Sequence, residues 1–445
     1  MSFFRREPPT GIKVVIVGTG FAGLSAALEC YRKGHSVQVL ESFTERKVLG
    51  DVISFGPNAS HIFSAWPDFT SRLSKFCHST NEIIIKNYLG ETLLNQSWAE
   101  EEKTYGINYN GHRGEIHSAL FDYAKEVGID IRLGHKVTDY FENDDEAGVV
   151  VNGEKFVGDV VLAADGVRST GRTIVLGYED KPKSSGYAVY RAWFEAAKLR
   201  EDPELSFIFE NPDELVTWIG QDIHFIAATP KNGIDFSWVC THKDDADIKE
   251  SWQTHAPLAD AKKNLEGWDP IVHKIMDATP DPVIDWKLVY RDPLPNWVSP
   301  KRRIALIGDA AHPFLPTSIQ GATQALEDGT TLGVCLANCV TSSGKNVQEA
   351  LLAFEALRYD RVLKAQKTGE KTRDRWHKAN WEEVKKNPKS VSLQREEWLL
   401  NFNAEEYAKK NYHATVQELR KKTANGVTGV NGGKLEQSGA ISVCG

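Results

Sequence analysis

The 445-residue sequence lacks the features that place a chain in a membrane or on a nucleic acid. It contains no run of about 18 apolar residues, so no membrane span is expected. The first residues, MSFFRREPPTG, hold no apolar segment long enough for a secretory signal, and an intracellular, cytoplasmic location is expected. The 53 basic and 61 acidic side chains give a net charge of -8 without a basic block, which argues against a nucleic-acid partner.

The sequence also lacks a cysteine framework and the residue patterns of nucleophilic or metal catalysis. The six cysteines are scattered along the chain, which is typical of a protein in a reducing compartment. Cys335 and Cys339 are expected to pack on one face of a helix. No Ser-His-Asp set, activated thiol or metal-ligand spacing is evident, so neither nucleophilic catalysis nor a metal site is predicted.

A β-α-β pattern opens the chain and predicts a nucleotide-type domain. The apolar run IKVVIVG, residues 12–18, is typical of a strand buried on both faces of a parallel sheet. A helix is expected from about 22 to 33, followed by a second strand, HSVQVLE, that ends at residue 41. The predicted fold class is α/β, with a Rossmann-like domain at its start.

The texture of the sequence changes along the chain, and its length calls for more than one core. Alternating aromatic and β-branched stretches after residue 186 predict a mixed or antiparallel sheet inserted into the first domain. A buried strand, RRIALIG, then returns to the first domain. The predicted parts are the cofactor domain at 1–185, with a possible contribution to the second domain near 70–110, the β-rich substrate domain at 186–292, the returning segment at 293–370, helices at 371–424 and a flexible tail at 425–445.

The motif GTGFAG, residues 18–23, links the first strand to the first helix. In such a turn Gly18 makes the tight bend, Gly20 lets a pyrophosphate approach the backbone, and Gly23 lets helix and strand pack closely. Glu41 ends the second strand, where its carboxylate can accept hydrogen bonds from ribose hydroxyls. The pattern predicts a bound dinucleotide, and both NAD and FAD fit it.

Two later stretches place an acid after a predicted buried strand. In DVVLAADGVRSTGR, residues 159–172, Asp165 precedes a glycine and is, taken alone, best explained as a simple strand-to-turn step. In residues 302–332, Asp309 follows the strand RRIALIG at the sheet edge where ligands of α/β proteins bind. His312 is interpreted as a packed or capping histidine, because no second metal ligand stands at a useful spacing.

These motifs together resemble the class A flavoprotein monooxygenases, the single-component aromatic hydroxylases of the para-hydroxybenzoate and salicylate hydroxylase type. The resemblance covers about residues 12 to 370. It is carried by GTGFAG with Glu41, by AADGVRSTGR, by FEALRYDRVLKAQ and, most specifically, by IGDAAHPFLPTSIQGATQALEDG. The middle region is most similar to the fungal secondary-metabolism branch, which includes salicylate hydroxylase-like enzymes and indole-alkaloid epoxidases.

The resemblance implies that FAD is the bound dinucleotide and that NAD(P)H is a transient reductant. It also assigns roles to matching residues along the chain. The implied FAD contacts are Gly18, Gly20, Gly23 and Glu41 for the adenosine and pyrophosphate, Arg113 near the phosphates and ribityl chain, Asp165 in a motif shared with nicotinamide, Asp309 for the ribityl hydroxyls, the N–H groups of Gly321 and Ala322 for the pyrimidine edge, and Pro313 and Pro316 beside the reacting C4a position.

The substrate side is predicted less directly. Arg191 lies in an otherwise apolar strand, where it forms either an ion pair between domains or a catalytic contact above the pocket. Aromatic residues of the same region are expected to line that pocket, as is an acid in a loop that departs from the family pattern. These pocket residues are Tyr190, Trp193, Trp218, Trp238 and Asp51, the last of which a solvated loop position also explains.

The activity implied is insertion of one oxygen atom from O2, through a flavin C4a-hydroperoxide, into an electron-rich aromatic small molecule. The interpretation favoured is 2,3-epoxidation of an indole in a fungal natural product, and the alternative is hydroxylation of a salicylate or phenol. Two other classes stay open, an FAD oxidoreductase that inserts no oxygen and a non-enzymatic FAD-binding homologue.

Overall fold

The computed structural model describes residues 4–46, 48, 50, 52–78, 80, 82–211, 213–244 and 254–425. Its cofactor half is built on a parallel sheet of five strands in the order β18-β11-β1-β2-β7. β1 lies at the centre of this sheet, as its sequence KVVIV predicts, because such an apolar strand is stable only when both of its faces are covered. These strands are β1 (Lys13–Val17), β2 (Ser36–Leu40), β7 (Asp130–Arg132), β11 (Val160–Ala163) and β18 (Ile304–Leu306).

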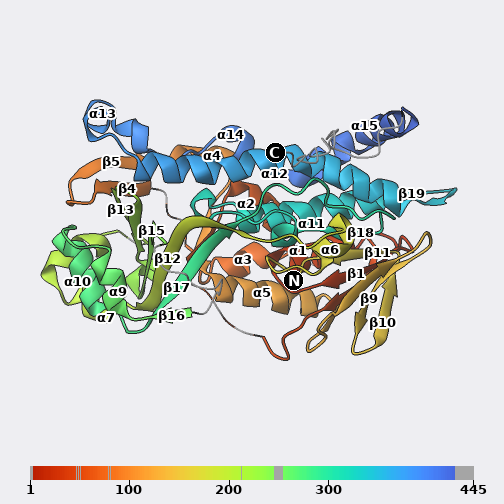
Figure 1. Ribbon diagram of the computed structural model, residues 1–445, viewed down its shortest axis with the longest axis horizontal. Helices are drawn as coiled ribbons and strands as arrows, with labels where there is room; N and C mark the ends of the chain where they lie inside the picture. Colours follow the sequence, from red (N-terminus) through yellow and green to blue (C-terminus); the bar gives the residue numbers. More distant parts are fainter. Residues whose placement is uncertain are drawn as a thin grey trace, which may run out of the picture.

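Helices cover one face of this sheet and a small second sheet covers the other (Figure 1). The closest helix pair is α1 with α11, where a side chain on Gly329 would place its Cβ 2.5 Å from the Ala26 nitrogen. The helices of this layer are α1 (Phe21–Arg32), α2 (Pro57–Ser64), α3 (Phe69–Leu73), α5 (Arg113–Glu126) and α11 (Gly321–Asn338). The small sheet comprises β8 (Asp139–Glu142), β9 (Ala147–Val151) and β10 (Glu154–Gly158), and α6 (Gly171–Leu176) lies beside it.

The second half of the molecule is a sheet of eight strands in the order β16-β17-β12-β15-β14-β13-β4-β5. Only β13 and β4 are parallel neighbours, and every other adjacent pair is antiparallel. The strands are β4 (Glu82–Asn87), β5 (Thr92–Ser97), β12 (Lys183–Glu195), β13 (Leu215–Gly220), β14 (Ile223–Ala228), β15 (Asp235–Lys243), β16 (Thr254–Ala256) and β17 (Val283–Tyr290). This arrangement confirms the predicted α/β fold with an inserted mixed sheet.

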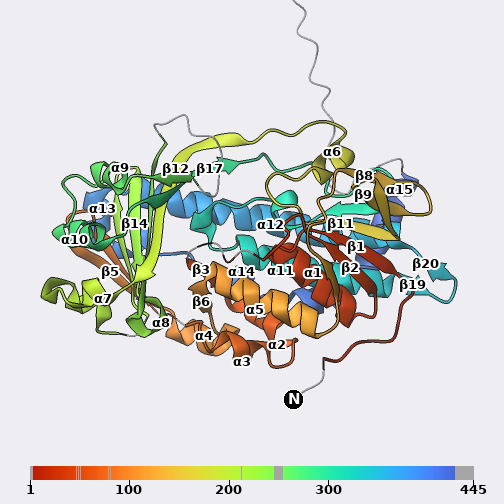
Figure 2. The same ribbon diagram turned by 90° about the horizontal axis from the view of Figure 1, so that it is seen from below.

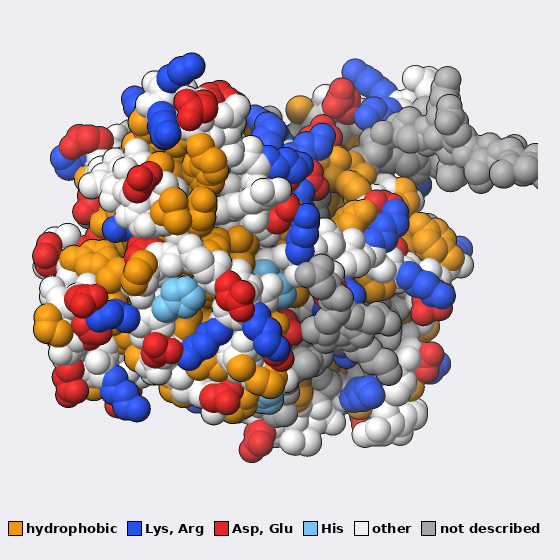
Figure 3. Space-filling model, turned by 60° about the vertical axis from the view of Figure 1, so that its left-hand side comes forward, with side chains coloured by type: hydrophobic (Ala, Val, Ile, Leu, Met, Phe, Trp, Pro, Cys, Tyr) orange, Lys and Arg blue, Asp and Glu red, His pale blue; other side chains and the backbone are white. Residues whose placement is uncertain are grey.

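One face of the eight-stranded sheet packs against short helices. These are α7 (Ala197–Arg200), the 3-10 helix η1 (Pro203–Phe209), α9 (Leu258–Lys263) and α10 (Pro270–Ala278), and together they enclose the second hydrophobic core. The helical stretch breaks before Pro270, because a proline fits the first turn of a helix better than its interior. On the side shown in Figure 3, acidic and basic side chains are both spread over the surface.

The C-terminal helices join the two halves. The longest, α12 (Val347–His377), passes from α11 in the cofactor half to β13 and β14 in the sheet half (Figure 1). It is followed by α13 (Trp381–Lys386), the 3-10 helix η4 (Pro388–Val391), α14 (Glu397–Leu400) and α15 (Ala404–Ala424). Within the described residues, no helix combines the length and the apolar character needed to cross a membrane. Cys335 and Cys339 are both buried in the core around α11.

The remaining elements are small and lie between or beside the two halves. The pair β3 (Val52–Phe55) and β6 (Tyr109–His112) is antiparallel and leads directly into α5. The others are α4 (Ala99–Tyr105), α8 (Pro230–Gly233), the hairpin of β19 (Val340–Thr341) and β20 (Gly344–Lys345), and the 3-10 turns η2 (Gly308–Ala310) and η3 (Pro316–Ser318).

Candidate functional site

In the glycine turn before α1, two glycines are required by the fold and a third leaves space for a ligand. Gly18 has a φ of +102°, and a Cβ there would lie 2.5 Å from the carbonyl oxygen of Ala164. A Cβ on Gly23 would lie 2.0 Å from the carbonyl oxygen of Gly18, so the fold itself requires both residues. Gly20 differs, because its φ is -65° and a Cβ there would meet nothing within 4 Å. No atom of the described residues fills the space in front of Gly20, and a ligand group fits there.

That ligand group is expected to be an anion. The N-terminus of α1 has no side-chain cap, so its first N–H groups are available to a ligand. These donors and the positive end of the helix dipole favour a phosphate or pyrophosphate. The uncapped turn and the space beside Gly20 together fit the diphosphate of a dinucleotide.

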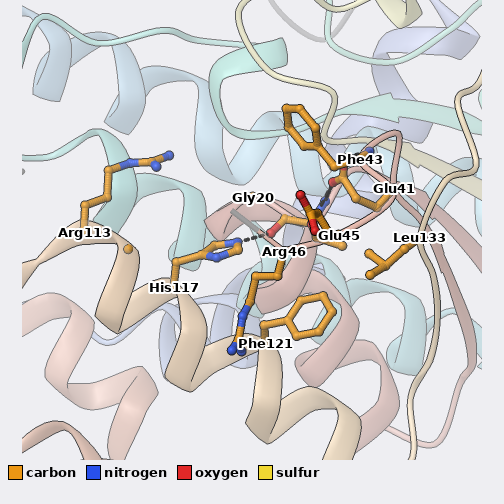
Figure 4. Close-up of a pocket in the computed structure, with 11 residues that line it drawn as sticks. Gly20, Glu41, Phe43, Glu45, Arg46, Arg113, His117, Phe121 and Leu133 are labelled. Atoms are coloured by element: carbon orange, nitrogen blue, oxygen red, sulfur yellow. Dashed lines mark hydrogen bonds between the residues drawn. The ribbon is translucent and has the colours of Figure 1, made fainter. Parts of the chain in front are cut away.

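A cleft of about 160 Å³ opens beside this turn, between α1, α5 and the carboxyl end of β2 (Figure 4). Its walls are both apolar and charged, as an adenosine with its ribose requires. The lining residues are Thr19, Gly20, Glu41, Phe43, Glu45, Arg46, Arg113, Gly114, His117, Phe121 and Leu133. The predicted residues Gly20, Glu41 and Arg113 thus come together at one cleft.

The Glu41 carboxylate is already well supplied with hydrogen bonds. One oxygen accepts from the N–H of Thr19 at 2.8 Å and from its hydroxyl at 2.7 Å, and the other accepts from the Ser42 hydroxyl and the Phe43 N–H. Burial raises the pKa of Glu41, but the hydrogen bonds from Phe43 and Thr19 outweigh it and lower the pKa overall. To bond this carboxylate as predicted, a ribose hydroxyl would have to replace the hydroxyl of Thr19 or Ser42 as a donor.

His117 belongs to this cleft although the sequence did not single it out. Its Nε2 donates to the carbonyl oxygen of Thr19 at 2.6 Å, which ties α5 to the glycine turn (Figure 4). Burial lowers the pKa of the His117 imidazole. His117 follows Arg113 by one helical turn in HRGEIHSAL, and that spacing is the signal from which it could have been found.

Asp309 lies on the turn η2, directly after β18. It is half-buried, and burial raises the pKa of its carboxyl group. The turn is fixed by Arg172, which is 2% exposed and donates to the carbonyl oxygens of Asp309 and Ala310 at 2.6 and 2.7 Å. Arg172 also donates to the Val167 carbonyl at 2.6 Å, so one guanidinium joins the two predicted motif loops. Arg172 lies within AADGVRSTGR, and nothing in that motif alone indicates these distant carbonyl partners.

Asp165 caps the helix after its own loop. Its Oδ2 accepts from the N–H groups of Thr170 and Gly171, at the start of α6, and from the Tyr140 hydroxyl at 2.9 Å. Its Oδ1 is buried with no hydrogen-bond partner in the described part of the chain. The structure therefore gives Asp165 a capping role, and the contact to the cofactor stays a prediction.

His312 lies in a buried polar network behind the Asp309 turn. Its Nε2 is 2.7 Å from Oδ2 of Asp328, which also accepts from the Gly308 N–H at 2.9 Å. The other Asp328 oxygen accepts from Arg358, and burial of this carboxyl is outweighed by His312 and Arg358, which lower its pKa. His312 is thus a packed histidine within the fold, as its sequence position suggested.

The segment before α11 carries the other predicted flavin contacts. Gly321 and Ala322 form the first turn of α11, which has no side-chain cap. Pro316 begins η3 and is exposed, and Pro313 is half-buried. The segment is held from behind by α12, because Thr317 donates to the Gly369 carbonyl at 2.8 Å. An uncapped 18-residue helix can direct its positive end at negative charge.

The eight-stranded sheet divides the predicted pocket residues between its two faces. Trp218 and Trp238 are 0% exposed, and Tyr190 lies with them in the core against α9 and α10. The indole N–H groups of the two tryptophans are satisfied there, by Asp269 and Thr279. This placement corrects the expectation that Tyr190, Trp218 and Trp238 line the substrate pocket, because alternate residues of a strand point to opposite faces.

Arg191 and Trp193 point to the other face, toward the cofactor half. Trp193 contacts His112 of β6, with ring centroids 4.9 Å apart. Arg191 is 6% exposed, and its guanidinium carbon lies 5.3 Å from the centre of the Trp286 ring. Strand register places Val239 and Ile284 directly beside Arg191, and both are half-buried. The remaining candidate, Asp51, lies outside the described residues.

Comparisons with known proteins agree with this site. A family model described as "FAD binding domain" matches residues 99–368, and a second model of that description matches residues 13–51. The FAD-dependent monooxygenase okaB of Penicillium ochrochloron is 34% identical over 421 residues, which are 92% of each chain. The asperlicin C monooxygenase of Petromyces alliaceus is 33% identical over 427 residues, which are 93% of this chain and 91% of that protein.

A solved structure also matches the whole fold. The crystal structure of CtdE with FAD and a substrate superimposes with a TM-score of 0.85 at 34% identity, covering 92% of this chain and all of the other. These matches show that the protein binds FAD. That the glycine turn, the cleft beside Glu41 and the two motif loops joined by Arg172 contact the FAD stays a prediction. The chain belongs to the class A FAD-dependent monooxygenases, in the branch of fungal secondary metabolism.

Proposed function

We propose that the protein uses FAD and NAD(P)H to insert one atom of O2 into an indole ring of a fungal natural product, by 2,3-epoxidation. Family membership supports the FAD-dependent oxygenation. The name of one relative, asperlicin C monooxygenase, gives the compound that this relative oxidises and supports a natural-product substrate. The observation that carries the substrate class is the sheet face around Arg191.

Around Arg191, that face carries aromatic and aliphatic side chains. Trp193, Trp286 and Ile284 are half-buried on it, and Arg191 lies among them. A flat aromatic substrate fits such a surface, because its ring can pack against indole and aliphatic side chains. The five N–H donors of Arg191 allow it to bond a substrate oxygen while keeping other partners.

Bound FAD, once reduced by NAD(P)H, would supply the activation of O2. The protein's own residues bind and orient. Gly20 and the start of α1 would hold the pyrophosphate, Glu41 the ribose, and Asp309 the ribityl hydroxyls. The N–H groups of Gly321 and Ala322 would stabilise negative charge on the pyrimidine edge, since both lie at the positive end of α11.

The role proposed for Arg191 is to donate hydrogen bonds to the oxygen that the substrate gains. An epoxide opens more readily when its oxygen accepts a hydrogen bond from a cation, since negative charge develops there. The apolar neighbours Val239 and Ile284 keep water away from that oxygen and strengthen the interaction. Arg191 is thus the catalytic residue that we assign.

Hydroxylation of a salicylate or phenol is the alternative within the same class. Its support is the same guanidinium, which can pair with a carboxylate or phenolate in two parallel hydrogen bonds. The two functions differ in what stimulates oxidation of the reductant. Purified holoenzyme is assayed for NADH and NADPH oxidation with indole alkaloids and with salicylates, and stimulation by neither group would contradict both.

An FAD oxidoreductase that inserts no oxygen is the alternative of another class. It is tested by running the stimulated reaction under ¹⁸O₂ and measuring the product by mass spectrometry. One labelled atom in the product is the expected result. Unlabelled product formed at the same rate would refute oxygen insertion while leaving FAD binding intact.

A further inference from the structure

The four residues His112-Arg113-Gly114-Glu115 are the last residue of β6 and the first three of α5, and side chains of the other half of the molecule contact them. Arg113 and Gly114 line the cofactor cleft from one side. The residues at either end, His112 and Glu115, are instead contacted by Trp193 of β12 and by Lys231 of α8, the short helix between β14 and β15. Figure 2 shows α8 next to β6 and the beginning of α5. α8 and β6 are in contact.

At the first end, Trp193 packs its ring against His112. The two rings meet edge to face, at 75°, with centroids 4.9 Å apart. His112 donates from Nε2 to the carbonyl oxygen of Gly50 at 2.9 Å. Gly50 in turn lies against Arg113, since a Cβ on Gly50 would be 2.8 Å from the Arg113 Cβ. The contact of Trp193 with His112 therefore helps to fix the backbone on both sides of Arg113.

At the second end, Lys231 forms an ion pair with Glu115 across the two halves. Its Nζ lies 2.8 Å from Oε1 of Glu115 and 2.9 Å from Oδ2 of Asp235. The same Asp235 oxygen accepts from the indole N–H of Trp193 at 3.1 Å. Asp235 thus joins the ammonium and the indole into one unit that contacts both ends of the segment.

The backbone that carries Lys231 is strained. Lys231 and Asn232 both have a φ of 55°, a left-handed conformation that is uncommon for residues other than glycine. Neighbouring groups hold it there, because Arg200 donates to the carbonyls of Gly233 and Asn232 at 2.7 and 2.8 Å. The Asn232 N–H also bonds Asp213 at 3.0 Å. Strain that the surroundings enforce is a sign that the position of the side chain matters.

We infer that Lys231, Asp235 and Trp193 form a positioning unit through which the substrate-bearing sheet sets the place of Arg113 in the FAD cleft. Lys231 and Trp193 touch Glu115 and His112, and Arg113 lies between these two. None of the three residues lines the cleft itself, so the unit acts on the cofactor through the segment that carries Arg113. Lys231 is the residue of the unit to replace, since its ammonium forms an ion pair between the halves, with Glu115.

The test is a titration of FAD into the full chain stripped of its cofactor, followed by flavin fluorescence. Lys231→Met is expected to raise the FAD dissociation constant roughly two- to five-fold, the range that one partly exposed ion pair supports. Lys231→Arg is expected to restore the affinity, because it returns a cation to both carboxylates. Glu115→Gln serves as a second variant, and its effect combined with Lys231→Met is expected to be less than additive.

Lys274→Met is the matched control. Lys274 also pairs with two acids, Asp202 at 2.9 Å and Glu204 at 3.0 Å, and it is 31% exposed against 28% for Lys231. It lies on α10, on the face of the sheet away from the cofactor, so its loss is expected to leave FAD affinity unchanged. Equal FAD affinity in the Lys231→Met, Lys274→Met and unaltered proteins would overturn the inference. No substrate enters this titration, so its outcome is independent of the proposed epoxidation.

Discussion

Replacing Gly20 by valine is expected to abolish tight FAD binding without unfolding the protein. Gly20 has a φ of -65°, which valine adopts without strain, and a Cβ at this position meets nothing within 4 Å. Gly20 is the N-cap position of α1, and valine is less favourable there than glycine, so the free energy of unfolding is expected to fall by at most about 1 kcal/mol. The cofactor-free variant is therefore expected to unfold close to the temperature of the unaltered protein.

The effect on the cofactor is much larger. The added side chain occupies the space that the pyrophosphate needs and keeps it from the N–H groups at the start of α1. A hydrogen bond to a charged group contributes about 1.5–3 kcal/mol, so losing two of them costs about 3–6 kcal/mol. That free energy corresponds to a rise of roughly 10²- to 10⁴-fold in the FAD dissociation constant.

The assay is an FAD titration of the stripped protein, together with its thermal unfolding in the absence of FAD. Gly23→Val is the matched control, because a Cβ there would lie 2.0 Å from the Gly18 carbonyl oxygen. Its destabilisation is expected to exceed the roughly 1–3 kcal/mol of an ordinary overpacked site. If Gly20→Val bound FAD as tightly as the unaltered protein, the placement of the pyrophosphate beside Gly20 would be refuted.

Three further changes test other parts of the structure. Arg191→Lys is expected to lower kcat roughly ten- to hundred-fold with FAD affinity unchanged, since lysine lacks the planar set of donors. A kcat within twofold of normal would contradict a catalytic role. Arg358→Met removes a cation that Asp328 and Glu327 share in the core. Urea unfolding is expected to show a free energy of unfolding lower by about 3–5 kcal/mol. An unchanged free energy of unfolding would mean that the network repacks. Burial raises the pKa of Glu405, but Lys33 and Arg32 lower it to about 2, so its stabilising effect is complete above about pH 4.5 and is lost as the pH falls through 2. Glu405→Gln is therefore expected to cost up to about 3 kcal/mol at pH 7 and progressively less below pH 4.5 in unfolding experiments, and a pH-independent difference would exclude this linkage.

The sequence was most informative where a function depends on neighbouring residues. The GTGFAG turn, the strand before it and the helix after it could be predicted from a short motif, since glycines at these spacings follow an apolar strand and open a helix within one β-α-β unit. The same holds for the helix that begins at Gly321 and for the break before Pro270, where helix chemistry fixes the boundary. These features could be predicted because short stretches of sequence signal them, although Gly18 is also fixed by a distant contact, with the Ala164 carbonyl oxygen.

The pocket could not be predicted in the same way. Trp193 and Trp238 are both aromatic residues of strands in one sheet, yet they point to opposite faces. Which face is core depends on where α9 and α10 pack, and that is a property of the tertiary structure. Arg172 was equally hidden, because its carbonyl partners at Asp309 and Ala310 lie more than a hundred residues away. Composition indicated a substrate surface but could not say which tryptophans belong to it.

The pairing of α1 with α11 has a consequence for how the protein is made. Ser25 donates to the carbonyl oxygen of Leu326, 301 residues later in the chain, at the place where the two helices are in closest contact. At a translation rate of 5–20 residues per second, roughly 15–60 s pass between synthesis of these two positions. The glycine turn therefore emerges from the ribosome long before its supporting helix exists. We expect nascent chains that end before α11 to expose the apolar face of α1 and to depend on chaperones.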